Sequence, residues 1–295
     1  QALSSFAVDI MFAQVLLLVM SAGMLSCQAY DSNYVLDNAE RYIKLAGAAY
    51  CTDPKLRKNS IDDWSCKVCA NFPNMTAHSF KSSKNDANGF VGYDGDANEI
   101  IISFSGTDPT SIRNWIDDLK FRKVKYPYCD KCEVHDGFYH SFQSVEDDVK
   151  KFVSSFQAQY PTATLAVTGH SLGAAMAAHA VAEYTHMGVT VSTAYAYGMP
   201  RVGEDSFEQW YASVVPGTFR VNHNRDPVPH LAPESFDFHH MPYEVFYEDD
   251  YKQWKLCSFE GEDKTCADQY KNTDVLNHLV YLDFDIVENY LSCAL

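Results

Sequence analysis

The sequence Gly-His-Ser-Leu-Gly at residues 169–173 constrains this chain more than any other feature. A short β-prone run over residues 164–168 precedes it, and an alanine-rich, helix-favouring stretch over residues 174–184 follows it. A serine between two glycines at a sharp strand-to-helix turn is typical of a nucleophile elbow. In that turn Ser171 would stand at the N-terminus of the helix, where the helix dipole can stabilise an oxyanion. The alternative is an ordinary glycine-rich turn in which Ser171 only caps the helix.

Strands and helices are expected to alternate along the chain. The apolar residues between Phe142 and Tyr160 recur every three or four positions, which predicts one long amphipathic helix that Pro161 ends. The other expected elements are a helix over residues 38–50 and strands over residues 99–104, 191–197 and 219–222. This alternation predicts an α/β fold with a central, mostly parallel mixed sheet and helices on both faces.

An elbow serine needs a histidine as its base and an acid that orients the histidine. In the α/β-hydrolase arrangement both partners follow the serine, with the acid first. Asp226 fits the acid, because it lies between the strand at residues 219–222 and Pro227, where catalytic groups gather in parallel sheets. Asp237 and Asp249 are the alternatives.

The residues alone leave the position of the histidine open. His230 lies only four residues after Asp226, which is too near to reach back easily. His239, His240 and His278 remain as candidates, and His278 stands between two leucines after a long loop.

Two further parts of such a site can be placed. The backbone N–H of Leu172 is one expected oxyanion donor, and Thr107, on the loop after an early strand, is the other. Residues 111–119 follow that loop and predict a helical lid, whose apolar face would cover the cleft or meet lipid. The apolar residues proposed for this face are Ile112, Trp115 and Ile116. A helix that is packed permanently into the core is the alternative.

The N-terminal region predicts an exported protein. An apolar run over residues 15–25 leads to small residues up to Ala29, which is typical of a signal peptide that is cleaved there. We expect a signal peptide over residues 11–29, upstream sequence over residues 1–10, and one secreted, extracellular domain over residues 30–295. A buried N-terminal helix or a retained membrane anchor is the alternative.

Cysteine usage agrees with export. Of nine cysteines, cleavage would remove Cys27 and leave eight, an even number suited to disulfides in an oxidising compartment. The pairs Cys66/Cys69 and Cys129/Cys132 also have the spacing of zinc ligands, so a zinc site is an alternative to two local disulfides.

Two surface features bear on modification and partners. Asn74 begins an Asn-Met-Thr glycosylation sequon, which is meaningful in a secreted chain. The formal net charge of −16 argues against nucleic acid as a partner, because an acidic surface repels phosphate backbones.

Several segments, taken together, resemble the class 3 lipase family, the fungal-type secreted triacylglycerol lipases. The resemblance covers residues 38–295. It rests on the order and spacing of the motifs SGT (105–107), SIRNWI (111–116), VHDGF (134–138), AVTGHSLG (166–173), PRVG (200–203), RDPVPHL (225–231) and VLNHL (275–279).

The resemblance implies an α/β-hydrolase fold with a helical lid. It implies Ser171, Asp226 and His278 as the catalytic triad, with Thr107 and Leu172 as oxyanion donors and Trp115 as the lid tryptophan. The family's cysteine pattern implies the disulfides Cys51–Cys293, Cys66–Cys69, Cys129–Cys132 and Cys257–Cys266. The triad chemistry requires no metal and no cofactor.

Three residues depart from the family pattern and bear on the substrate class. Ser105 stands where the family often has arginine, Ala174 where many members have glycine, and Asn277 where an acidic residue is common. Ala174 is shared with related feruloyl esterases.

The resulting expectation is a serine carboxylic ester hydrolase, first a triacylglycerol lipase. A feruloyl-type or other soluble-ester esterase and a phospholipase A1 are the enzymatic alternatives. A non-catalytic lipid-binding protein on this scaffold is the contrasting class. The expected partners are an ester substrate and a transient lipid interface, with the chain itself a monomer.

Overall fold

The computed structural model describes residues 34–53, 55–56, 60–215, 217–249 and 251–293. The predicted upstream segment and signal peptide, residues 1–29, lie outside the described residues. Chain contacts group Val35–Leu295 into one unit. Among the described residues, no helix combines the length and apolarity needed to cross a lipid bilayer.

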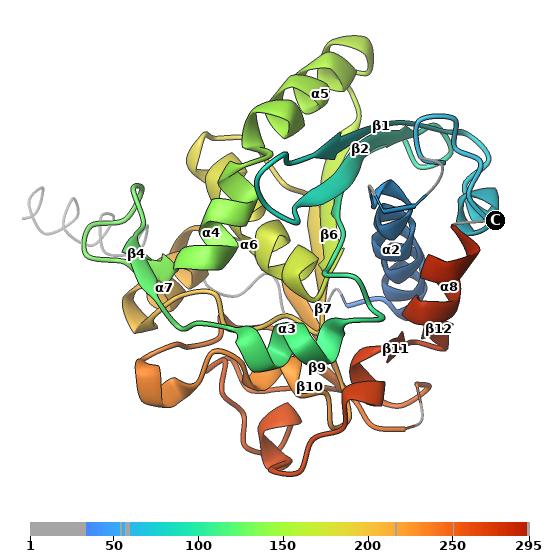
Figure 1. The fold of residues 1–295 in the computed structure, drawn as a ribbon. Coiled ribbons are helices and arrows are strands. Elements are labelled where there is room, and N and C mark those ends of the chain that lie inside the picture. The colour runs from blue at the N-terminus through green and yellow to red at the C-terminus, as the bar shows by residue number, and fades with distance from the viewer. Residues whose placement is uncertain (1–33, 54, 57–59, 216, 250, 294–295) are drawn as a thin grey trace, which may run out of the picture. The chain divides into compact units, whose positions relative to one another are not determined.

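A mixed sheet of eight strands forms the centre of this unit (Figure 1). In spatial order its strands are β1 (Met75–Lys81), β2 (Asn88–Asp94), β3 (Glu99–Phe104), β6 (Thr164–His170), β7 (Thr193–Tyr197), β8 (Phe219–His223), β9 (Glu244–Tyr247) and β10 (Trp254–Leu256). The pairings from β3 to β9 are parallel, whereas β1–β2, β2–β3 and β9–β10 are antiparallel. The predicted mostly parallel mixed sheet is therefore confirmed.

Shorter strands and the helices complete the described elements. Two small antiparallel pairs are β4 (Lys123–Lys125) with β5 (Glu133–His135), and β11 (Val280–Tyr281) with β12 (Phe284–Asp285). The α-helices are α2 (Leu36–Ala49), α3 (Ile112–Asp118), α4 (Asp136–Gln143), α5 (Glu146–Gln159), α6 (Leu172–His186), α7 (Asp205–Val214) and α8 (Ile286–Ser292).

Helices cover both faces of the sheet, as expected (Figure 1). On one face, the hydroxyls of Ser103 in β3 and Thr168 in β6 donate to main-chain carbonyls of α2. On the other face, apolar side chains of the same strands share one core with α4, α5, α6 and α7. Strands covered on both sides are buried throughout, and all six residues of β3 are buried.

The composition of α6 explains how it sits against the sheet. Thirteen of its fifteen residues, Leu172 to Tyr184, are buried, and six of these are alanine. Alanine favours the helix and has a short side chain, so the helix axis can approach the strands closely. The N-terminus of α6 is thereby held at the carboxyl end of β6, where the elbow lies.

The long amphipathic helix predicted between Phe142 and Tyr160 is wrong at its start. The structure has two helices there, because α4 ends at Gln143 and α5 begins at Glu146. The Ser144 hydroxyl donates to the carbonyl of Ser141, and three acidic residues then open α5, where negative charge favours a helix N-terminus. The apolar spacing continues across this break, which is why periodicity alone did not reveal it.

The structure contains the four disulfides that the resemblance implies. They are Cys51–Cys293, Cys66–Cys69, Cys129–Cys132 and Cys257–Cys266. The sulfurs of both Cys-x-x-Cys pairs are thus bonded to each other and are not zinc ligands. Cys51–Cys293 closes a separation of 242 residues, which in the chain-entropy treatment stabilises the fold by about 5 kcal/mol.

A buried acid on α6 predicts a pH-dependent stability. Glu183 is buried, and its Oε1 accepts a hydrogen bond from the Tyr139 hydroxyl at 3.2 Å. Burial, and after it the neighbouring Glu146, raise the pKa of Glu183 from 4.5 to about 8. The unfolded chain releases this proton near the ordinary value, so the stability contributed by neutral Glu183 is fully present below pH 4.5 and is lost as the pH rises through about 8.

We therefore expect Glu183→Gln to unfold at a higher temperature than the parent near pH 8, because the amide cannot ionise. The two proteins should converge near pH 4.5. Thermal unfolding followed by circular dichroism across this range measures the difference. Glu40→Gln, on the exposed side of α2, is the control and should follow the parent at every pH. A parallel pH dependence of Glu183→Gln and the parent would contradict the assignment.

Candidate active site

The turn between β6 and α6 has the backbone that a nucleophile elbow requires. Ser171 has φ 61° and ψ −128°, a strained conformation for a residue with a side chain. Its N–H donates to the carbonyl of Tyr197 at 2.9 Å. A Cβ on Gly169 would lie 2.3 Å from the Gly173 carbonyl oxygen, and a Cβ on Gly173 equally close to that of Phe104. Only glycine allows these backbones to pack so closely, so the turn depends on both positions.

His278 and Asp226 meet beside this elbow. Nδ1 of His278 lies 2.8 Å from Oδ2 of Asp226, although the residues are 52 positions apart. The Val228 N–H donates to the other carboxylate oxygen at 2.7 Å, and the Tyr281 hydroxyl donates to Oδ2 at 2.5 Å. Burial alone would raise the pKa of Asp226, but the histidine and these hydrogen bonds lower it below 3.8. Asp226 is therefore ionised and can orient the histidine ring.

The end of β7 contacts both Ser171 and His278. Tyr197 accepts the Ser171 N–H, and a Cβ on the next residue, Gly198, would lie 2.9 Å from Cε1 of His278. The Ser171 hydroxyl and Nε2 of His278 are buried and have no hydrogen-bond partner among the described residues. Nε2 is thus available to take a proton, while Nδ1 is held by the acid.

The other candidates for acid and base lie in different surroundings. Asp237 pairs with Lys123 at 3.1 Å, and Asp249 accepts from Asn224. The three remaining histidines have partners outside the Ser171 site: His230 lies near Asp268, His239 near Asp237, and Nε2 of His240 near the carbonyl of Pro229. Of the acids and histidines considered, the described structure brings two pairs together, Asp226 with His278 and Asp237 with His239, and the first is the pair beside the elbow.

The predicted oxyanion donors lie on either side of the serine. Leu172 is the first residue of α6, so its N–H has no acceptor within the helix. Thr107 follows Gly106, and a Cβ at Gly106 would lie 2.9 Å from Cβ of Ser171. The loop after β3 therefore passes close beside Ser171, as an oxyanion loop would have to.

The predicted lid is the short helix α3. Ile112 is buried, Trp115 and Ile116 are half-buried, and the polar residues between them are exposed. The Trp115 ring stacks 6.3 Å from that of Phe138 in α4, measured between ring centroids. Since Ser171 and His278 are both 0% exposed, a substrate can reach them only if a covering segment moves.

The N-terminal end of α3 is tied to the oxyanion loop. Asp108, next to Thr107, accepts from the N–H and the hydroxyl of Thr110 at 2.9 and 2.6 Å. The Ser111 N–H donates to the Asp108 carbonyl at 3.0 Å. A displacement of α3 would thus pull on Asp108, the residue that follows Thr107.

Sequence reasoning missed three residues that contact the triad and its surroundings. Tyr281 donates to Asp226, and Tyr50 and His170 form hydrogen bonds that end at the main chain of His278. His170 lies inside the elbow motif, which was the available signal for its position. The two tyrosines carry no local signal, because their partners are distant in sequence.

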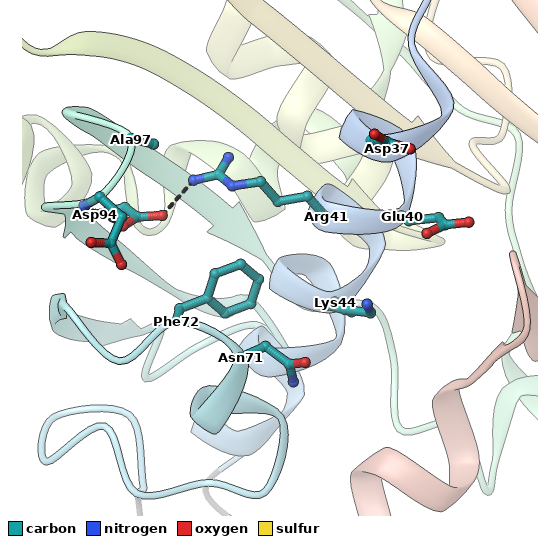
Figure 2. A pocket seen from close by; sticks show the side chains of 9 residues that line it. Asp37, Glu40, Arg41, Lys44, Asn71, Phe72, Asp94 and Ala97 are labelled. Atoms are coloured by element: carbon teal, nitrogen blue, oxygen red, sulfur yellow. Dashed lines mark hydrogen bonds and ion pairs between the residues drawn. The ribbon is translucent and has the colours of Figure 1, made fainter.

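A cavity on the α2 side of the sheet has a different character (Figure 2). It measures about 440 Å³ and is lined by Asp37, Glu40, Arg41, Lys44, Asn71, Phe72, Asp94, Asp96 and Ala97. Arg41 pairs there with Asp94 at 2.7 Å and with Glu99 at 2.6 Å. The cavity contains no triad residue, and its arginine is already neutralised.

Two groups of described side chains have ligand atoms close enough together to consider a metal ion: Glu244 with Cys257 and Cys266, and Glu234 with Glu262 and Asp268. In the first group the two sulfurs form a disulfide. The second surrounds the Arg201 guanidinium, which lies 2.8 Å from Glu262 and already supplies a cation. Neither group fits a metal site.

Comparison with known proteins agrees with this geometry. The family described as Lipase (class 3) matches residues 101–236. The chain is 35% identical over 202 residues to a lipase of Rhizomucor miehei, which covers 66% of this chain and 55% of that protein. The chain thus spans little more than half the length of that relative.

Two further comparisons cover a larger share of the related protein. The chain is 32% identical over 213 residues to secreted mono- and diacylglycerol lipase A of Penicillium cyclopium, covering 70% of this chain and 68% of that protein. A solved structure, described as showing that a serine protease triad forms the catalytic centre of a triacylglycerol lipase, aligns with a TM-score of 0.78. It is 29% identical and covers 86% of this chain and 96% of that chain. On the extent of these matches, the chain belongs to the class 3 lipase family.

Proposed function

We propose that this chain is a secreted serine carboxylic ester hydrolase that acts on glycerides, with Ser171, His278 and Asp226 as its catalytic triad. The observation that carries the proposal is the ionised, three-fold hydrogen-bonded Asp226 that holds Nδ1 of His278 beside a strained elbow serine. This constellation generates an oxygen nucleophile without a metal.

The reaction proceeds in two halves. His278 Nε2 takes the proton of the Ser171 hydroxyl as its oxygen attacks the ester carbonyl carbon. The N–H groups of Thr107 and Leu172 stabilise the resulting oxyanion, and the imidazolium returns the proton to the leaving alcohol as the ester bond breaks. A water molecule, deprotonated by His278, then attacks the acyl-enzyme, and collapse of the second tetrahedral intermediate releases the acid and restores Ser171.

Several features support a lipid ester as substrate. The buried triad and the short amphipathic helix that follows the Thr107 loop suit a lid that opens at a lipid surface. Leu276, two residues before His278, is 65% exposed, and Phe236, which is 54% exposed, packs on Phe121 just after α3. Exposed apolar side chains of this kind suit contact with lipid. The net charge of −16 favours neutral glycerides over anionic lipids.

Hydrolysis of emulsified triolein, compared with soluble p-nitrophenyl butyrate, tests this function. A lipase should cleave triolein and become more active as the substrate passes its solubility limit. Cleavage of the soluble ester alone would favour the esterase alternative, which Ala174 and the acidic surface allow. If a folded protein cleaves neither substrate, the proposed function is wrong.

A lid variant tests how the substrate gains access. Ile116→Ser removes an apolar side chain from α3, and the lost contact with lipid is worth about 1.5 kcal/mol. We expect the rate on emulsified triolein to fall about tenfold, and the rate on p-nitrophenyl butyrate to change little. Both rates are measured per active site.

Asn114→Ser is the matched control for this variant, because Asn114 lies on the exposed side of the same helix. It should leave both rates unchanged. If Ile116→Ser lowers both rates equally, α3 is a permanently packed helix and not a working lid.

The proposal extends to processing of the chain. Export after cleavage at Ala29 would leave one hydrolase domain over residues 30–295, modified at Asn74. The four disulfides and the names of the secreted Penicillium relatives support this location. The N-terminal sequence and glycosidase sensitivity of the protein recovered from culture medium test it.

A further inference from the structure

Tyr50 and His170 connect three parts of the proposed active site. The Tyr50 hydroxyl lies 2.7 Å from Nδ1 of His170, and Nε2 of His170 lies 2.8 Å from the main-chain oxygen of His278. Tyr50 opens the turn after α2, His170 ends β6, and His278 ends the turn Val275–His278. Tyr50 and His170 are fully buried, so water does not compete for these hydrogen bonds.

The direction of each hydrogen bond follows from the chemistry of the groups. Burial, and after it the neighbouring His278, lower the pKa of His170 to about 3, so its ring is neutral and carries one N–H. A carbonyl oxygen can only accept, which places that proton on Nε2, toward His278. Nδ1 is then an acceptor, and Tyr50 must donate to it. Burial raises the pKa of Tyr50, so its hydroxyl keeps the proton that it donates.

The other side of the Tyr50 hydroxyl reaches the oxyanion loop. The Tyr50 hydroxyl oxygen packs directly against the main chain of Gly106. A Cβ on Gly106 would lie 2.3 Å from this oxygen and 2.8 Å from the carbonyl oxygen of His170. Tyr50 therefore contacts the main chain of Gly106 and donates to His170, which in turn donates to the main chain of His278.

We propose that Tyr50 and His170 are positioning residues for ester hydrolysis, whose relay fixes the oxyanion loop relative to the catalytic histidine. The proposal rests on the proposed function. The Tyr50 hydroxyl and Nε2 of His170 each donate to one acceptor, so the two protons can be arranged in only one way. The Cys51–Cys293 disulfide and the Tyr290 ring hold Tyr50 in place. A displacement of about 1 Å between reacting groups can lower the rate about 10²-fold, so a relay that holds these groups in place can raise the rate substantially.

Tyr50→Phe tests the relay, because it removes the hydroxyl and keeps the ring. Nδ1 of His170 then loses its donor, and the main chain of Gly106 loses the oxygen atom against which it packs. We expect kcat per active site to fall about tenfold or more, with KM for p-nitrophenyl butyrate changed less than about twofold. Active sites are counted by titration with a fluorescent alkyl phosphonate, so unfolded protein does not enter the value of kcat.

Tyr211→Phe is the matched control. Tyr211 is a buried tyrosine on α7 whose hydroxyl bonds to Thr218 at 2.5 Å. Its loss should lower the melting temperature by a similar amount and leave kcat unchanged. If Tyr50→Phe keeps the parent's kcat per titrated site, Tyr50 is only structural and the relay is wrong, although the proposed function stands. If the parent neither cleaves esters nor reacts with the phosphonate, the proposed function fails, and the relay fails with it.

A measurement on the parent protein tests the relay even if Tyr50→Phe does not fold. Nitrogen-15 spectra of the histidine-labelled protein, assigned by triple resonance, report the protonation of each ring nitrogen. We expect His170 to stay neutral with its proton on Nε2 between about pH 5 and pH 9. A His170 ring that carries its proton on Nδ1, or that titrates in this range, overturns the proposal.

Discussion

Replacing Ser171 with alanine is expected to lower kcat for p-nitrophenyl butyrate by about 10⁶-fold. Alanine has no nucleophilic oxygen, so no acyl-enzyme can form, and only the oxyanion donors and substrate binding remain to accelerate attack by water. Because the Ser171 hydroxyl has no hydrogen-bond partner among the described residues, its removal should leave the melting temperature nearly unchanged. Release of p-nitrophenol and thermal unfolding measure the two effects.

Ser103→Ala is the control, because it should lower the stability of the protein and leave its activity unchanged. Ser103 is a buried serine of β3 whose hydroxyl donates to the carbonyl of Leu45 at 3.0 Å. Its loss should cost about 1 kcal/mol of stability and leave kcat unchanged. A Ser171→Ala protein that retains the parent's rate would show that another residue is the nucleophile, and the proposed triad would have to be abandoned.

Asp226→Asn is expected to lower kcat by about 10⁴-fold. The carboxylate accepts from three donors: Nδ1 of His278, the Tyr281 hydroxyl and the Val228 N–H. An asparagine amide has only one oxygen, so in either orientation its NH₂ group faces at least one of these donors. In either orientation the histidine loses the negative charge that stabilises the imidazolium, and in one of them it also loses its hydrogen-bond acceptor.

The comparison for this variant is Tyr281→Phe, which removes one donor and leaves the charge of Asp226. Its loss of kcat should be much smaller than that of Asp226→Asn. The parent and both variants are compared by titration with the phosphonate and by rate per titrated site. Equal losses in the two variants would mean that the buried geometry, and not the carboxylate charge, carries the role of Asp226.

The elbow is the part of the site that local sequence predicts best. The two glycines, the β-prone run before them and the alanine-rich run after them are neighbours in the chain, so the turn could be predicted from residues that touch each other locally. The structure has β6 ending at His170 and α6 beginning at Leu172, with Ser171 strained between them. The same holds for β3 and for α3, whose patterns are short and uninterrupted.

Elements with weaker local patterns were less predictable. The break between α4 and α5 leaves the apolar spacing intact and is marked only by a serine and by acidic residues at the start of α5. The antiparallel strands β1 and β2, at the sheet edge beside β3, were not predicted. A strand at an edge carries less of the hydrophobic pattern, and β1 alternates buried and exposed residues along most of its length.

By itself, the sequence determined the α/β alternation, and it predicted a serine nucleophile and an acid at the end of a strand. It left three histidines open, and resemblance to a family, not the residues, selected His278. Only the tertiary structure brought His278 and Tyr281, 52 and 55 residues away, onto Asp226, and Tyr50 onto His170 across 120 residues. The physical reason is that a hydrogen bond depends on distance in space. The packing of α2 and the C-terminal turns around the carboxyl end of β6 decides which distant side chains come within 3 Å of each other.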